Sequence, residues 1–137
     1  MSSSTRKAPK FLGVFAAGLL TASALVATVG DDPLIAAQTF AYAENQAAGA
    51  TVATVVASDN VAVTGYRFTA TGTNTSADGF YAISNAGVIT LTAAGAASAR
   101  NDFETAPNSG SYDVIASDAA GNSRTATITL SETDVDD

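Results

Sequence analysis

The chain of 137 residues contains neither cysteine nor histidine and has a formal net charge of −7 at pH 7. It therefore offers no disulfide, no thiolate metal site and no imidazole to act as a general base or zinc ligand. Half of its 6 basic residues lie before residue 11, whereas all 13 acidic residues lie from Asp31 onward. An acidic body repels nucleic-acid phosphates, so we expect no nucleic-acid partner.

The first thirty residues combine a basic flank with a long apolar run. Residues 1–10 are polar and basic, and residues 11–30 (FLGVFAAGLLTASALVATVG) carry no charge. A helix of about 20 residues is about 30 Å long, the thickness of the hydrocarbon core of a bilayer. Basic residues before the run and acidic residues after it predict a cytoplasmic N-terminus, with the rest in the periplasm or outside the cell.

Two interpretations of residues 11–30 stay open. The run continues past Ala24 to Val29, which favours a retained single-pass transmembrane anchor. The small residues Ala22-Ser23-Ala24 instead fit the cleavage site of a signal peptide. Both interpretations place the body outside the cytoplasm, and we carry the anchor forward.

The body shows short β-branched or alternating runs separated by Gly, Asn, Asp and Ser. Residues 31–38 are interpreted as a linker, and residues 93–100 as one helical turn or a loop. The expected strands are 39–43, 51–58, 65–71, 80–84, 87–91, 111–117 and 124–130. Short strands spaced by turn signals predict an all-β domain over residues 39–137, a seven-stranded antiparallel Greek-key β-sandwich preceded by the N-terminal helix.

The inward positions of these strands define the expected hydrophobic core. They are Val52, Val55, Ala57, Tyr66, Phe68, Tyr81, Ile83, Ile89, Leu91, Tyr112, Val114, Ile128 and Leu130.

Carboxylates occur in three separated places: Glu44, residues 102–104 and residues 134–137. Two unit charges about 4 Å apart repel by about 4 kcal/mol at an effective dielectric constant of about 20. If the fold gathers these places at one end, a cation must offset the repulsion, and oxygen-only ligands indicate a hard one such as Ca²⁺. The alternative is that the acids stay apart and are solvated.

Several motifs follow one another between residues 40 and 137. They are ENQAAG (44–49), VATVVASD (52–59), FYAI with GVITL (80–83 and 87–91), DFE (102–104), YDV through ASDAAGN (112–122) and TDVDD (133–137). Their order and spacing resemble a single cadherin-type repeat in a divergent bacterial form. The resemblance implies a β-sandwich and a role in cell adhesion or protein–protein contact.

The resemblance also implies a set of Ca²⁺ ligands. The side-chain ligands would be Glu44, Asp102, Glu104, Asp134 and Asp137, with Asp136 where the family usually has Asn and Val135 offering its backbone carbonyl. Asp59 and Asp118 match ligands that face the preceding linker. In the family the next repeat lends further ligands, so for a lone repeat we expect a Kd of roughly 10⁻⁴–10⁻³ M or weaker.

We expect no enzymatic activity and no small-molecule substrate. The chain has no histidine, no cysteine, no G-x-S-x-G motif and no phosphate-binding glycine loop. Two functions remain open. One is a small, membrane-anchored structural subunit of a larger membrane assembly, with other membrane or extracytoplasmic proteins as partners. The other is a secreted or surface-displayed, calcium-dependent adhesion module, released by signal-peptide cleavage.

Overall fold

The computed structural model of the protein describes residues 32–59 and 62–135. The expected anchor or signal helix at residues 11–30 and the acids Asp136 and Asp137 lie outside these residues. Within the described part of the chain, no helix is long and apolar enough to cross a membrane.

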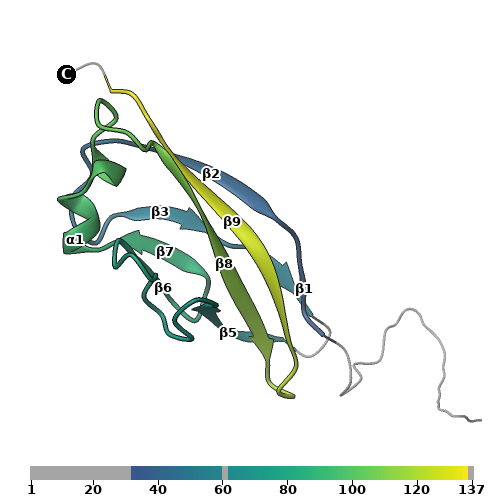
Figure 1. Ribbon diagram of the computed structural model, residues 1–137. Coiled ribbons are helices and arrows are strands. Elements are labelled where there is room, and N and C mark those ends of the chain that lie inside the picture. The colour runs from purple at the N-terminus through teal and green to yellow at the C-terminus, as the bar shows by residue number, and fades with distance from the viewer. Residues whose placement is uncertain (1–31, 60–61, 136–137) are drawn as a thin grey trace, which may run out of the picture. The chain divides into compact units, whose positions relative to one another are not determined.

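The described part is mostly β-structure arranged in sheets (Figure 1). The larger sheet has the strand order β2-β9-β8-β5. Its members are β2 (Gln38–Ala43), β5 (Val63–Phe68), β8 (Ser109–Asp118) and β9 (Ser123–Thr133). A second sheet, ordered β3-β7-β6, contains β3 (Thr51–Thr54), β6 (Tyr81–Ile83) and β7 (Val88–Leu91). The short strands β1 (Leu34–Ile35) and β4 (Ala57–Ser58) pair with each other.

Pairing is antiparallel except between β2 and β9, which run parallel from Gln38↔Ile128 to Ala43↔Thr133. The antiparallel β8–β9 pair extends from Ser109↔Ser131 to Ser117↔Ser123. Both strands alternate apolar and polar residues, so one face turns toward the core and the other toward water.

The hydrophobic core joins residues of the two larger sheets. All expected core residues are buried except Ala57 and Tyr112, which are partly buried against the core. Tyr42, Ala53 and Ala116 are buried in addition. Ile128 and Leu130 of β9 are completely buried, and each such side chain stabilises the fold by about 1.5–3 kcal/mol.

The N-terminal edge differs from the expected linker and single strand. Within the expected linker, Leu34–Ile35 form β1 and Gln38 begins β2. The expected strand 51–58 is divided into β3 and β4 because the chain leaves the ladder at Val55 and Val56. Val55 N–H donates to the Gly87 carbonyl (2.8 Å), and the Gln38 side chain bonds both Val56 N–H (3.0 Å) and Val56 C=O (2.9 Å). The Gln38 side chain thus makes the two hydrogen bonds with the Val56 backbone that a neighbouring strand would otherwise make.

Two short helices connect β7 to β8, where the sequence predicted a helical turn or a loop. They are α1 (Ala93–Ala96) and the 3₁₀ helix η1 (Ala99–Asn101). Thr92 caps α1 by accepting the Gly95 N–H (3.0 Å), and Ser98 caps η1 by accepting the Arg100 N–H (3.0 Å). These caps satisfy backbone donors that short helices leave free. They fix the start of the loop that carries Asp102 and Glu104.

Candidate cation site

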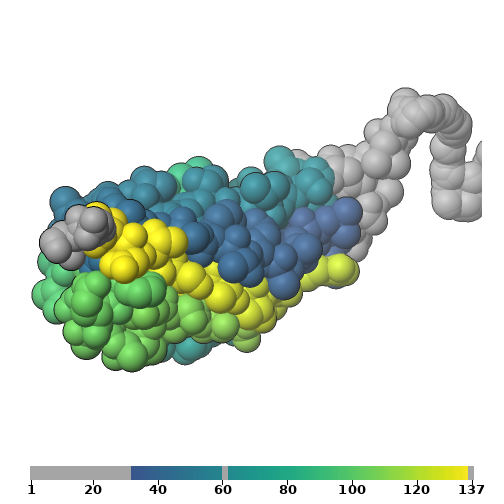
Figure 2. All heavy atoms as spheres, turned by 90° about the horizontal axis from the view of Figure 1, so that it is seen from above, coloured from purple at the N-terminus to yellow at the C-terminus, as the bar shows by residue number. Residues whose placement is uncertain are grey.

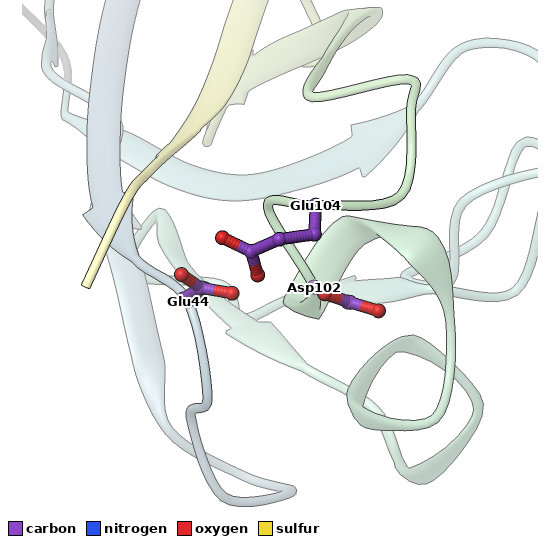
Figure 3. A group of neighbouring side chains, drawn as sticks. All are labelled: Glu44, Asp102 and Glu104. Atoms are coloured by element: carbon purple, nitrogen blue, oxygen red, sulfur yellow. The ribbon is translucent and has the colours of Figure 1, made fainter. Parts of the chain in front are cut away.

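Three carboxylates meet at the end of β2 and in the loop after η1. Glu44, Asp102 and Glu104 each have one oxygen atom within 4.8 Å of those of the other two (Figure 3). Glu44 is buried, whereas Asp102 and Glu104 are exposed. We call these three residues the acidic triad. The triad therefore joins two of the three acidic places that lie apart in the sequence, and Asp134 of the third place interacts with Glu44 and Glu104.

Backbone pairing positions Glu44. Its N–H donates to the Thr133 carbonyl (3.1 Å), which extends the β2–β9 ladder by one residue. Asn45 then adopts a positive φ of 67°, a conformation that asparagine tolerates better than most residues, and its N–H donates to the Asn101 carbonyl (3.1 Å). This turn directs the chain from β2 toward η1.

The buried side chain of Asn101 joins the two segments that carry the triad. Its Oδ1 accepts the Gln46 N–H (2.7 Å), and its Nδ2 donates to the carbonyls of Gln46 (2.8 Å) and Ala96 (3.0 Å). Asp102 follows directly in the chain. Asn101 therefore holds the two loops at the separation that the triad requires.

The Glu44 carboxylate also binds the C-terminal segment. Its Oε2 accepts the Phe103 N–H (2.8 Å), and its Oε1 accepts the Val135 N–H (2.9 Å). The hydrogen bonds from Val135 and Phe103 lower the pKa of Glu44 below its usual value. Glu44 is therefore ionised at neutral pH and ties the loop after η1 to the residues after β9.

The pKa of Glu104 shifts in the opposite direction from the pKa of Glu44. Desolvation, followed by the nearby carboxyls of Asp134 and Glu44, raises the pKa of Glu104 to about 7. Asp134, an exposed residue just after β9, thus belongs to the surroundings of the triad. Figure 2 shows the last residues of β9 (yellow) on the surface between the blue segment that contains β2 and the green segment that contains η1.

The residues present fit a hard divalent cation. Every side-chain donor is a carboxylate oxygen, the ligand type that Ca²⁺ prefers, and their mutual repulsion is relieved by positive charge. Glu44, Asp102 and Glu104 would hold the ion. The bound ion would supply charge neutralisation and would link the end of β2 to the loop after η1.

The predicted ligands Asp59 and Asp118 lie elsewhere. Asp118 is the last residue of β8, and the first residue of this strand lies near the triad. At about 3.3 Å per residue, the two ends of the 10-residue strand are about 30 Å apart. Asp118 is buried and interacts with Asp59. Its Oδ1 accepts the N–H groups of Ala120 (3.0 Å) and Asn122 (2.8 Å). The predicted metal ligands therefore form two separate groups, one at each end of β8.

Val135 makes a different contact from the one expected. Its N–H donates to Glu44, a contact that the resemblance did not imply. The ligand role that the resemblance implies for its backbone carbonyl concerns a different atom and stays a prediction.

One acid near the triad was not predicted at all. Glu132 on β9 is 4% exposed, and neither of its carboxylate oxygens has a hydrogen-bond partner among residues 32–59 and 62–135. Burial, followed by the charges of Glu44 and Asp102, raises the pKa of Glu132 to about 7. The alternation of β9 offered the signal, because Ile128, Leu130 and Glu132 occupy successive inward positions.

No protein-family model matches the sequence, and no curated protein matches it. Solved structures of cadherin ectodomains do resemble the chain. The match to the human desmocollin-1 ectodomain has a TM-score of 0.60 at 20% identity and covers 77% of this chain and 21% of that one. Domains 1–5 of protocadherin gamma B2 give 0.59 at 20% identity, with 88% and 22% covered. Drosophila N-cadherin domains 1–3 give 0.52 at 20% identity, with 72% and 32% covered.

These likenesses show the fold: the chain contains a β-domain folded like a cadherin extracellular domain. The resemblance seen in the sequence motifs is thereby confirmed at the level of the fold. The chain spans between 21% and 32% of the length of the three ectodomain structures above.

Proposed function

We propose that this chain is a non-enzymatic, cadherin-like module that acts outside the cytoplasm and mediates protein–protein contact. Its apolar segment 11–30 anchors it in the membrane, and it serves as a small accessory subunit of a larger membrane assembly. We also propose that the seven strands of the two larger sheets follow a Greek-key order. The observation that carries the proposal is the acidic triad at the end of a cadherin-like β-domain.

Calcium is the proposed ligand of the triad. A bound ion would stiffen the point where β9 ends, because Glu44 already contacts both the loop after η1 and the residue Val135. Three protein carboxylates leave coordination positions open for a cation that takes about 6–8 oxygen ligands. Oxygen atoms of a partner protein would fill them, so that calcium and the partner stabilise each other's binding.

Contacts of similar domains support the protein-binding role. One similar solved structure is a cis-dimer of protocadherin gammaB7 domains 3–6, which matches this chain at a TM-score of 0.57 and 18% identity. Adhesion after cleavage at Ala22-Ser23-Ala24 is the second candidate. The intact mass of the mature protein separates the two, since cleavage removes the anchor.

Calcium titration tests the metal site. Isothermal titration calorimetry and thermal melting of the full chain are compared between wild type, Glu104→Gln and the matched control Asp113→Asn. Asp113 is an exposed acid on the outer face of β8, so its replacement removes the same charge away from the triad. We expect binding and a higher melting temperature with Ca²⁺ in wild type and control, because a ligand of the native state stabilises it. Identical melting with Ca²⁺ and with chelator in wild type would refute the site.

A further inference from the structure

Glu132 occupies a position that its strand pattern reserves for the core. Ile128 and Leu130, the two preceding inward residues of β9, are completely buried. Glu132 continues this face and pairs with the buried Tyr42 of the parallel strand β2. A carboxylate is costly there unless hydrogen bonds or an opposite charge compensate for its lost hydration.

Hydrogen bonds do not compensate for the burial of Glu132. Both carboxylate oxygens are inaccessible to solvent and have no donor in the part of the chain that the structure describes. The side-chain oxygen of Asn108, whose backbone carbonyl accepts the Glu132 N–H (2.8 Å), is also buried without a donor. The unpartnered side-chain atoms on these two residues are therefore all acceptors.

The nearby protein charge does not neutralise Glu132 either. Arg100 is the cationic side chain that acts on Glu132. Its guanidinium instead donates to the Ser109 carbonyl and is packed so tightly over Gly110 that a Cβ there would lie 2.6 Å from its Nη2. The other charges acting on Glu132 are those of Glu44 and Asp102, both members of the triad.

We propose that Glu132, whose partner on β2 lies two residues before Glu44, adds a buried fourth negative charge to the cation site, and that the bound divalent ion provides the positive charge which Glu132 lacks. This inference rests on the proposed Ca²⁺ site and deepens it. The strand β9 would thereby contribute to the site from inside the domain.

The Glu132 carboxylate then has opposite effects in the ion-free and the ion-bound protein. Without the ion, the carboxylate is an uncompensated buried group and destabilises the domain. With the ion, the same charge strengthens binding. A buried residue with a purely structural role would change the stability of the ion-free protein and leave affinity for Ca²⁺ unchanged.

The experiment measures Ca²⁺ affinity by calorimetry and melting temperature in chelator for the full chain. The variants are Glu132→Gln, which keeps the shape, and Glu132→Leu, which follows the pattern of Ile128 and Leu130 and secures a folded variant. Asp113→Asn is the control for loss of one charge. We expect both Glu132 variants to melt at a higher temperature in chelator and to bind Ca²⁺ about 10- to 100-fold more weakly.

Three outcomes overturn the inference. If both Glu132 variants bind Ca²⁺ as tightly as the control, Glu132 is stabilised in another way, by a proton or by hydrogen bonds from a buried water. If both lose affinity and also melt at a lower temperature in chelator, the affinity was lost through damaged packing. If wild type and Asp113→Asn bind no Ca²⁺, the proposed site itself fails, a pattern distinct from the first two.

Discussion

The Glu44 carboxylate accepts the backbone N–H of Val135 across a sequence separation of 91 residues (2.9 Å). A member of the acidic triad therefore also holds the chain where it leaves the last strand. In the proposed calcium-bound form, metal binding and the conformation of the C-terminal segment would be coupled through this one side chain. Substitutions at Glu44 and Glu104 separate these two roles.

Replacing Glu44 and replacing Glu104 should have opposite effects on the ion-free protein. Glu44→Gln weakens two charge-assisted hydrogen bonds to backbone N–H groups, each worth about 1.5–3 kcal/mol, and should lower the melting temperature in chelator. Glu104→Gln removes a charge that Asp134 and Glu44 repel, and should leave this temperature unchanged or raise it. Both should weaken Ca²⁺ binding. Thermal melting in chelator, paired with calorimetry, checks this; equal destabilisation by both variants would contradict it.

The stability of the ion-free protein should fall as the pH rises from about 5 to about 8. Burial and the neighbouring acids raise the pKa values of Glu132 and Glu104 to about 7, above those of the unfolded chain. Between the two values the folded state retains protons that the unfolded state has lost, so stability decreases with rising pH and is lowest above about pH 7. Chemical denaturation in chelator at several pH values measures the slope, and Glu132→Gln should flatten it. A slope that stays the same in that variant would show that another group titrates.

Affinity for calcium should increase with rising pH, whereas the stability of the ion-free protein should decrease. Protons compete with the ion for Glu104, so binding should weaken as the pH falls from about 8 to about 6. Calorimetry in two buffers of different ionisation enthalpy should detect proton release on binding near neutral pH. Binding without proton release would contradict the elevated pKa.

Asn101→Ala should damage both the fold and the site. The variant removes the side-chain hydrogen bonds to Gln46 and Ala96 and leaves backbone groups without partners at a buried position. Each unsatisfied buried group costs about 1–3 kcal/mol, so we expect a loss of several kcal/mol in the free energy of unfolding. Affinity for Ca²⁺ should fall as well, because the loops of Glu44 and Asp102 separate. Ser111→Ala, at an exposed position on β8, is the control.

Tyr112→Phe should destabilise the domain without affecting Ca²⁺. The Tyr112 hydroxyl donates to Asp78 (2.6 Å), which also accepts from Ser76 and from the Phe80 N–H. Although burial opposes it, these hydrogen bonds hold the pKa of Asp78 below its usual value. Losing one charge-assisted bond costs about 1.5–3 kcal/mol. A change in calcium affinity as well as in unfolding free energy would show coupling between this group and the triad.

The long strands could be predicted from the sequence because β8 and β9 alternate clearly over many residues. The pair β1 and β4 could not, since two-residue strands have no detectable period and the Gln38 side chain completes their pairing with a nonlocal contact. Glu44, Asp102 and Glu104 were found through motif order. Glu132 was missed because the expected strand ended at residue 130, whereas β9 continues to Thr133.

The parallel pairing of β2 and β9 has a mechanical consequence. Tension applied at the start of β2 and at the end of β9 pulls the two strands past each other along their length, so the paired residues from Gln38↔Ile128 to Ala43↔Thr133 are loaded together rather than one after another. A ladder sheared in this way resists rupture far better than one that unzips from an end. Force applied between Gln38 and Thr133 would therefore load the whole β2–β9 ladder in shear.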